Sequence, residues 1–312
     1  MRQSQGIKNK LSSNICRIVE KGRFCLLHPL LPMTTSIAYL GPKGTFSEFS
    51  AAAYADSLGE RPSKMEAYPT IAQAINATEQ GKADCCVVPI ENSIGGGVTL
   101  TLDTLWNIET LHIQQAFTLP VQHALISSAA QLSDIEVVYS HPQALSQCRD
   151  WLANHIPEAQ LVPASSTAEP LPKLKENDRT AAIASKWGAK MYGIPVLAHP
   201  INDFADNYTR FWVLSKQPTH AGKHTSLAFK LLSNEPGALL KPLQLFSALN
   251  INMSRIESRP TKQLLGDYIF FVDIEASASD PIMQTALELL KLHTATYKNF
   301  GSYNLIELEL PA

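Results

Sequence analysis

The chain has 312 residues, a length that favours at least two domains at the usual ~100–200 residues per domain. Because 45% of the residues are hydrophobic and 17% are charged, the composition supports folded cores and excludes a wholly disordered protein. Lys and Arg total 26 against 28 Asp and Glu, without the basic excess typical of nucleic-acid binders. No apolar run approaches the ~18–20 residues of a membrane span. We therefore expect neither nucleic acid nor a membrane as a partner.

Residues 1–33 differ from the rest of the chain, and we do not expect them to belong to the fold. They are basic and poor in acids, which leaves three interpretations open. The first is an upstream mis-start, since Met33 directly precedes the first ordered pattern. The other two are a dispensable extension and an organelle transit peptide. The five cysteines form no CxxC pair and no Cys/His cluster, so no metal site is expected. Their odd number favours a reducing, cytoplasmic location.

The next part of the chain alternates short apolar runs with amphipathic stretches, the pattern of a parallel α/β unit. Ser47 is a candidate N-cap for the first helix, because its hydroxyl can accept from free N–H groups of the first turn. Pro69-Thr70 opens the second helix, which ends at Gly81. Strands are predicted at 36–40, 64–68 and 83–90.

A second α/β unit follows. Its strands are predicted at 136–139, 160–163 and 180–185, and its helices at 142–154 and 167–175. The extended segment 111–126 can cross from the first unit to the second, and the apolar run 207–214 can cross back. Two lobes joined by two crossings predict a periplasmic-binding-protein-like domain over 34–217, with lobes at 34–113 plus 200–217 and at 114–199.

A polar linker then leads into a different module, residues 223–312. Its elements read in the order βαββαβ, which is typical of the ferredoxin-like fold. Pro236 and Pro281 open its two helices, and the segment YNLIELEL is expected to close the sheet. The fold class is therefore α/β, with parallel sheets in a two-lobed domain and a smaller C-terminal domain.

Polar segments follow several of the predicted strands of the two-lobed domain. GPKGTFS, PIENSIGGG, SHPQ and SST each lie at the carboxyl end of a strand, just before a helix. In open α/β sheets this edge binds ligands, because helix N-termini present unpaired N–H groups there. Each segment alone is a weak signal, and none has the spacing of a nucleotide-binding loop. Together they favour a small organic anion, with no metal and no cofactor required.

A longer set of motifs resembles the prephenate dehydratase family. GPKGTFSEFSA, VPIENSIGGGVTLTLDTL, YSHPQALSQC, SSTAEP, AAIASKWGAKMYGI and NYTRF occur in the order and approximate spacing of that family. EPGAL and ESRP, in the C-terminal module, resemble the two signatures of its ACT regulatory domain. The similarity extends from Thr34 almost to the last residue. Bifunctional members place a chorismate mutase domain of ~90 residues first, and 33 residues are too few for one, so a monofunctional enzyme is expected.

The resemblance implies a hydro-lyase that converts prephenate to phenylpyruvate with loss of water and CO2, on the route to phenylalanine. Thr209 matches the key catalytic threonine of the family, and Asn92 and Gln143 match residues implicated in the active site. A threonine hydroxyl is a very weak acid, so it needs partners that stabilise its oxyanion or return its proton. Further substrate-binding candidates are Thr45, Phe46, Ser93, Ser166, Thr167, Arg210 and Phe211.

Two of these candidates have structural alternatives. Alternation along a strand points Thr209 and Arg210 to opposite faces of the sheet. Arg210 is therefore either a partner for a substrate carboxylate or a structural residue. Phe211 is also explained by simple packing.

The ACT module implies L-phenylalanine as an allosteric effector, bound at an interface between two subunits. A homodimer or homotetramer is therefore expected, and effector binding must favour one arrangement of the catalytic lobes. The effector-binding residues implied by the resemblance are Gly237, Ala238, Leu239, Glu257, Ser258, Arg259 and Pro260.

Two alternatives stay open. Arogenate dehydratases share the same motifs and the same regulatory domain, so the substrate is prephenate or arogenate. A non-catalytic sensor of amino acids or small anions is the alternative from another functional class, although the intact NYTRF motif counts against it. Turnover by the purified protein, compared with that of a Thr209→Val variant, separates an enzyme from a sensor.

Overall fold

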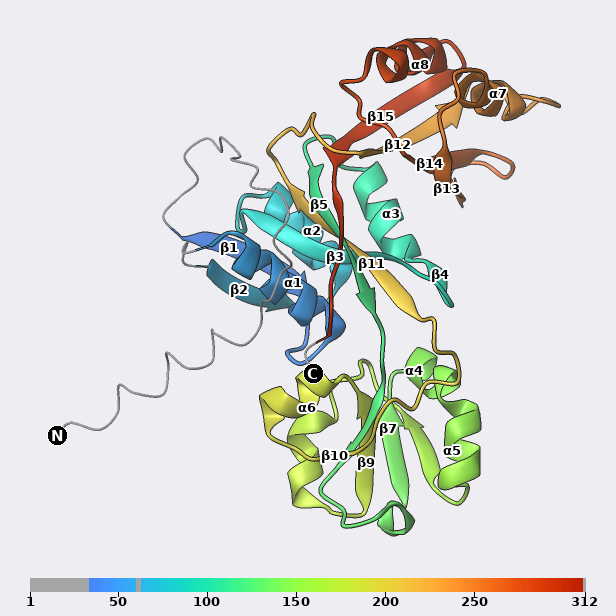
Figure 1. Ribbon diagram of the computed structural model, residues 1–312. Helices are drawn as coiled ribbons and strands as arrows, with labels where there is room; N and C mark the ends of the chain where they lie inside the picture. Colours follow the sequence, from blue (N-terminus) through green and yellow to red (C-terminus); the bar gives the residue numbers. More distant parts are fainter. Residues whose placement is uncertain (1–33, 60–62, 311–312) are drawn as a thin grey trace.

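The computed structural model describes residues 34–59 and 63–310, and the interpretations of residues 1–33 lie outside this part of the chain. Figure 1 shows two α/β lobes, one above the other, with the C-terminal domain on the far side of the first lobe. Within the described residues, no helix is both long and apolar enough to cross a membrane.

The first lobe is built on a mixed sheet with the strand order β16-β5-β11-β3-β1-β2, and β4 pairs with β3. The central strand β3 is buried along most of its length, which explains its continuous apolar sequence. Strand β1 pairs in parallel with β2 and β3, as predicted, while β11 returns antiparallel between β5 and β3. The elements of this lobe are β1 (Thr35–Leu40), α1 (Phe46–Ser57), β2 (Ser63–Tyr68), α2 (Ile71–Glu79), β3 (Cys85–Asn92), β4 (Gly96–Gly97), α3 (Thr99–Trp106), β5 (His112–Pro120) and β11 (Tyr208–Ser215).

The N-cap of α1 is Thr45, and the prediction of Ser47 is wrong. Thr45 has an extended backbone, and its hydroxyl accepts from the Glu48 N–H at 3.2 Å. Ser47 already lies inside the first turn and is buried. The N-cap residue precedes the first residue with helical backbone angles, so a residue inside the first turn cannot cap the free N–H groups.

The second lobe has the sheet order β10-β6-β9-β7-β8. Its elements are β6 (Ala124–Ser127), η1 (Leu132–Asp134), β7 (Val137–Ser140), α4 (Pro142–Gln147), α5 (Arg149–His155), β8 (Gln160–Pro163), η2 (Leu171–Glu176), β9 (Thr180–Ala184), α6 (Lys186–Tyr192) and β10 (Val196–Ala198). The chain enters this lobe from β5 into β6 and leaves it from β10 into β11, which are the two predicted crossings.

Two helix predictions in this lobe are wrong. The helix predicted at 142–154 is broken at Cys148, because the Asp203 carboxylate accepts from the N–H groups of Asp150 and Trp151 and caps a new helix there. The helix predicted at 167–175 does not form. Its place is taken by the 3₁₀ segment η2. This segment contains Pro172, which lacks the backbone N–H that the interior of an α-helix needs.

The C-terminal domain is the predicted ferredoxin-like sandwich. Its antiparallel sheet has the order β13-β14-β12-β15. Helix α7 begins at Leu240, four residues after the predicted Pro236, while α8 begins at Pro281 as predicted. The elements are β12 (His224–Leu231), α7 (Leu240–Ala248), β13 (Met253–Pro260), β14 (Tyr268–Ile274), α8 (Pro281–Lys291) and β15 (Thr294–Tyr303).

The expectation that YNLIELEL closes this sheet is wrong. The closing strand is β15, and the following β16 (Leu305–Glu307) pairs in parallel with β5 of the first lobe. Leu308 and Leu310 then pack against the core of that lobe. This packing stabilises the segment in its position on the first lobe. In Figure 1 this segment runs from the C-terminal domain down along the first lobe.

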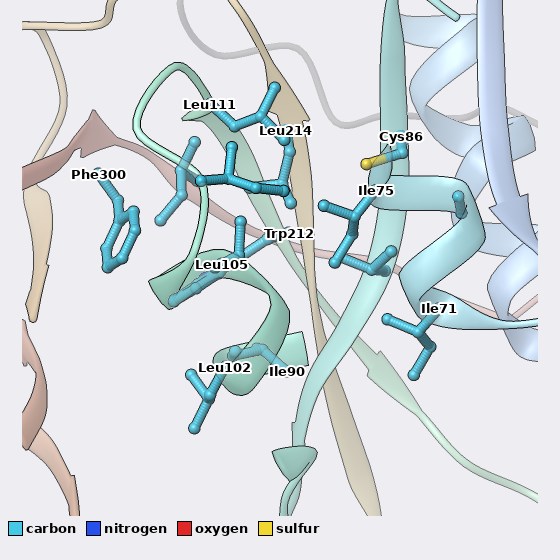
Figure 2. Close-up of a cluster of buried hydrophobic side chains, with 14 of the residues drawn as sticks. Ile71, Ile75, Cys86, Ile90, Leu102, Leu105, Leu111, Trp212, Leu214 and Phe300 are labelled. Atoms are coloured by element: carbon cyan, nitrogen blue, oxygen red, sulfur yellow. The ribbon is translucent and has the colours of Figure 1, made fainter. Parts of the chain in front are cut away.

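The sheet of the C-terminal domain packs against the first lobe through aromatic side chains. The rings of Trp106 and Phe271 are 6.4 Å apart, and those of Trp212 and Phe300 are 6.5 Å apart. Figure 2 shows Phe300 from β15 beside the cluster that includes Trp212, Leu105 and Leu102. The two domains therefore share one hydrophobic core. Because such cores are closely packed, a displacement of one domain also displaces side chains of the other.

Candidate active site

The amide of Asn92 and the hydroxyl of Thr209 meet where β3 and β11 leave the first lobe. The two residues are paired across these strands, and Asn92 Nδ2 donates to Thr209 Oγ1 at 3.1 Å. The same amide donates to Asn207 Oδ1 at 2.6 Å. No acceptor for the hydrogen of the Thr209 hydroxyl lies among the residues that the structure describes, so this hydrogen is available to an incoming oxygen.

A tight turn after β3 fixes the orientation of Asn92. Its Oδ1 accepts from the N–H groups of Gly95 at 2.8 Å and Ile94 at 3.2 Å, an Asx-type turn. With the oxygen committed to these donors, the NH2 group must face Asn207 and Thr209. The ENSIGG segment thus sets the direction of the amide, which explains a polar, glycine-rich sequence directly after a buried strand.

Side chains of the second lobe extend this row of hydrogen bonds, which we call the polar chain. Asn207 Nδ2 donates to Gln147 Oε1 at 3.1 Å, and His123 Nε2 lies 3.0 Å from the same oxygen. Because an amide oxygen can only accept, His123 carries a proton on Nε2. Burial lowers the pKa of His123, so the ring is neutral at pH 7 with an unpartnered Nδ1. The chain from Thr209 to His123 therefore joins both lobes through neutral groups.

Gln143 also reaches the site, from the start of α4. Its Nε2 lies 3.5 Å from Asn92 Oδ1, and the amide packs directly over Gly95, where a Cβ would come within 2.4 Å of it. A side chain at position 95 would therefore displace the Gln143 amide from its place over this turn. Gln147, one helical turn later, lies at the same 3.5 Å from Asn92 Oδ1.

A second contact between the lobes surrounds the buried carboxylate of Glu48. It accepts from the Gly44 N–H at 2.6 Å, from the Tyr39 hydroxyl at 3.2 Å and from Trp187 Nε1 of the second lobe at 3.2 Å. Burial and the neighbouring Glu48 raise the pKa of Tyr39, which keeps its hydroxyl protonated as a donor. Ser185 Oγ donates to the Gly44 carbonyl at 3.0 Å, so the GPKGTF loop is held against α6.

A cavity of about 160 Å³ lies beside this contact, and a larger hollow of about 890 Å³ is lined by residues at the ends of β3 and β11. The larger one includes Asn92, Ser93, Glu91 and Arg210 and is bordered by the segment after β15. The smaller one brings residues of both lobes together with two basic side chains. Its lining residues are Phe46, Gln122, Ser185, Lys186, Trp187, His199 and Leu310.

The structure brings together the three residues expected to be catalytic, Thr209, Asn92 and Gln143. Ser93 adjoins them, but its hydroxyl already bonds the backbone of Tyr208 and Asp206. Within the described residues, the three catalytic candidates have no hydrogen bond to the other predicted substrate-binding residues.

The remaining substrate-binding candidates have other partners. Thr45 caps α1, and Phe46 lies against the ring of His123 in the smaller cavity. Ser166 accepts from the Glu169 N–H, and Thr167 follows it in the same turn. Arg210 forms ion pairs with acidic side chains on the face opposite Thr209, while Phe211 is buried in the core of the first lobe.

Three residues of the polar chain escaped the sequence analysis, namely Gln147, Asn207 and His123. Gln147 and Asn207 lie inside the quoted motifs YSHPQALSQC and NYTRF, so a signal was present. His123 lies in no motif and becomes visible only through its contact with Gln147. Within the described residues, no group of three or more His, Cys, Asp or Glu side chains is arranged to hold a metal ion.

The predicted effector residues lie on two segments of the C-terminal domain. Gly237 has φ +83° in the turn before α7, a conformation that favours glycine, and Ala238 and Leu239 complete that turn. The ESRP segment lies on the edge strand β13. Arg259 pairs with Asp103 of α3 at 3.0 Å and 3.1 Å, and Glu257 pairs with Arg255 at 2.8 Å. Within this single chain, no hydrogen bond or ion pair in the described part joins the two segments.

Comparison with known proteins identifies the family. The family model for prephenate dehydratase matches residues 37–219, and that for the ACT domain matches residues 225–288. A prephenate dehydratase from Lactococcus lactis subsp. cremoris is 35% identical over 87% of this chain and 98% of that protein.

Two solved structures are also similar. The prephenate dehydratase of Arthrobacter aurescens in complex with L-Phe is 34% identical, with a TM-score of 0.78, over 89% of this chain and 93% of that one. A structure described as GqqA, a novel type of quorum quenching acylase, is 26% identical, with a TM-score of 0.74, over 86% of this chain and 97% of that one. The similarity predicted from the motifs, the α/β fold class with its regulatory domain, and the hydro-lyase class are confirmed. The chain belongs to the prephenate dehydratase family, with a C-terminal ACT domain.

Proposed function

We propose that this chain converts prephenate to phenylpyruvate, with Thr209 delivering the proton to the departing hydroxyl. The supporting observation is the bond from Asn92 Nδ2 to Thr209 Oγ1, which occupies the oxygen and leaves the hydroxyl hydrogen free to donate. The same donor stabilises negative charge on Oγ1 as the proton leaves. An amide donor at this oxygen suits a proton donor better than an acyl-accepting nucleophile, which requires a base next to the hydroxyl.

The reaction balances with one proton and no redox partner. The ring C–O bond breaks as the hydroxyl takes a proton and leaves as water. The bond between the ring and its carboxylate breaks at the same time, CO2 leaves, and the electron pair of that bond completes the aromatic ring. The protein therefore has to supply one donor and a fixed orientation, both of which a rigid neutral site provides. Solvent returns the proton to Thr209 through the open side of the site.

The neutral character of the Thr209–His123 chain matters for the decarboxylation. A cationic group held against the ring carboxylate would stabilise the ground state and slow the loss of CO2. Asn92, Asn207, Gln147 and neutral His123 bring no positive charge to this edge. The pyruvyl carboxylate stays in the product, so a cation can hold it without slowing this step, and the candidate is Lys186 in the smaller cavity.

We also propose that L-phenylalanine binds the ACT domain and feeds back on turnover, as the L-Phe complex of the Arthrobacter relative supports. A homodimer or homotetramer with the effector between two ACT domains follows from the same proposal. The substrate is prephenate, with arogenate as the alternative. A cytoplasmic location fits the free, buried thiols of Cys85, Cys86 and Cys148.

The test is turnover of the purified chain on prephenate and on L-arogenate, each with and without L-phenylalanine. Phenylpyruvate formation that a Thr209→Val variant loses, and a Thr104→Val variant keeps, supports the proposal, because the Thr104 hydroxyl bonds the Leu100 carbonyl of its own helix. Preference for arogenate changes the substrate and keeps the mechanism. A folded protein that turns over neither compound overturns the assignment of activity and leaves a sensor.

A further inference from the structure

Four charged side chains form a closed ring between the two domains. Arg210 bonds Glu91 Oε1 and Asp273 Oδ2, each at 3.1 Å. Arg255 bonds Glu91 Oε2 at 3.0 Å and Asp273 Oδ2 at 3.4 Å. Each arginine therefore contacts both carboxylates. Glu91 and Arg210 belong to the catalytic domain, and Arg255 and Asp273 belong to the ACT domain. We call these four residues the interdomain ring.

The interdomain ring adjoins the catalytic pair directly. Arg210 and Glu91 are paired across β11 and β3, and the next pair along the same two strands is Thr209 with Asn92. Successive residues of a strand point to opposite faces, so the ring holds one face of these strand ends while the catalytic pair occupies the other. A shift of Arg210 and Glu91 tilts the backbone that carries Thr209 and Asn92.

The ring also adjoins the predicted effector strand. Arg255 lies on β13 and donates to Glu257 at 2.8 Å, the first residue of the ESRP motif. The Glu257 carboxylate in turn sits over Gly97, where a Cβ would come within 1.9 Å of it. Gly97 is paired with Glu91 in the turn after β3. The ESRP strand therefore reaches the catalytic strand ends through two contacts, one ionic and one steric.

Burial makes the ring sensitive to its geometry. The side chain of Asp273 is 2% exposed and that of Arg255 is 7% exposed, and Ser226 Oγ donates to the second oxygen of Asp273 at 2.6 Å. Buried charges need every partner in place, because a lost partner leaves a desolvated charge unpaired. Such a cluster occupies discrete arrangements instead of deforming smoothly, which suits it to pass on a change of state.

We propose that Arg210 is a positioning residue, which transmits the state of the ACT domain from Asp273 and Arg255 to the neighbouring Thr209 and Asn92. This inference rests on the proposed regulation by L-phenylalanine. Effector binding beside β13 displaces Arg255 and Glu257, the ring exchanges partners, and the ends of β11 and β3 follow. Arg210 thus acts through Thr209 and does not itself need to touch the substrate.

The experiment compares two properties of each variant: the affinity for L-phenylalanine, measured by calorimetry, and the factor by which saturating L-phenylalanine changes kcat/KM for prephenate. Asp273→Asn removes the carboxylate charge of the ring on the ACT side with little change of shape, and Glu91→Gln removes the one on the catalytic side. Glu109→Gln is the matched control, because it removes a different interdomain ion pair, that with Lys298 at 2.7 Å. Thermal melts show whether each variant is folded. If one of the two ring variants does not fold, the other alone is enough for the test.

We expect the affinity of Asp273→Asn and Glu91→Gln for L-phenylalanine to stay within about threefold of that of the wild type. The factor by which L-phenylalanine changes kcat/KM should fall by at least about fivefold, the lower end of typical coupling factors. Glu109→Gln should keep the full effect. Ring variants that are regulated like Glu109→Gln overturn the inference, as does a loss of regulation that merely parallels a loss of L-phenylalanine binding. A wild type that turns over prephenate without any response to L-phenylalanine also overturns it, and leaves the dehydratase assignment intact. A wild type without turnover overturns the proposed function instead.

Discussion

Asn92 donates its side-chain amide to the hydroxyl oxygen of Thr209 across two paired strands, at 3.1 Å. This arrangement separates the two functions of a hydroxyl group. Its oxygen accepts from the protein, and its hydrogen stays free to donate. The amide is in turn fixed by the N–H of Gly95, so the donor is oriented before any substrate arrives.

Replacing Thr209 by Val should abolish most of the turnover. The two side chains have nearly the same shape, so the substrate should still bind, and we expect kcat to fall by roughly 10²–10⁴-fold with a small change in KM. Thr209→Ser, which keeps the hydroxyl, should retain more activity than Val. Steady-state kinetics on prephenate measure both. Equal kcat values for the Val variant and the wild type would contradict a role of the hydroxyl in proton transfer.

The Asn92→Asp variant tests the direction of the same hydrogen bond. A carboxylate has no N–H to donate, and it would accept the Thr209 hydrogen that the substrate needs. A negative charge there would also oppose formation of the threonine oxyanion. We expect kcat to fall by about 10²–10³-fold, the usual cost of losing a donor to a developing negative charge. Retention of near wild-type kcat would show that the Thr209 proton is delivered without help from this amide.

The sequence allowed most elements to be predicted, because local periodicity determines them. β3 is buried on both faces and reads as one apolar run, and Thr70 caps α2 as the Pro69-Thr70 pair predicts. The failures come from long-range contacts. Asp203 breaks the helix predicted at 142–154 through contacts 52 and 53 residues apart along the chain. The segment of β16 joins β5 of the first lobe, although its alternation suits either sheet.

The candidate site could be predicted in part for the same reason. Thr209 and Asn92 lie in motifs with a recognisable family pattern, whereas Arg210 was left open between two roles because its partner Asp273 lies in another domain. His123 carries no local signal, since its contact with Gln147, 24 residues further along the chain, depends on how the second lobe packs. Residue type and spacing thus indicate which strand ends carry chemistry, and the tertiary structure determines which side chains meet.

Glu48 should contribute to stability by holding both lobes. Glu48→Ala leaves the N–H groups of Gly44 and Trp187 and the Tyr39 hydroxyl without their acceptor in a buried place, and we expect a loss of about 2–4 kcal/mol in the free energy of unfolding. Glu48→Gln keeps one acceptor oxygen and should cost less. Urea denaturation followed by tryptophan fluorescence measures the difference, with Glu66→Ala on the exposed side of β2 as the control. If Glu48→Ala and Glu66→Ala unfold at the same urea concentration, the buried carboxylate does not hold the lobes.

His123 should make the stability of the protein sensitive to acid. Its side chain is buried, and burial lowers its pKa from the usual 6.5, an effect only partly offset by the bond with Gln147. Above pH 6.5 the ring is neutral in both the folded and unfolded states and contributes no pH dependence. Below 6.5 the unfolded chain binds a proton that the folded chain does not, so stability falls as the pH is lowered, by up to ~1.4 kcal/mol per pH unit, until the folded-state pKa is reached.

The His123→Gln variant isolates this contribution. A glutamine can still donate to Gln147 Oε1 but does not titrate, whereas His112 and His199, whose pKa values burial also lowers, remain in both proteins. We therefore expect Tm to fall between pH 7.5 and 5.5 by several degrees more in the wild type than in His123→Gln. His155→Gln, at an exposed histidine, should behave like the wild type. Parallel Tm curves for the wild type and His123→Gln would mean that the pKa of His123 is the same in the folded and unfolded protein, which would contradict its burial as a neutral ring.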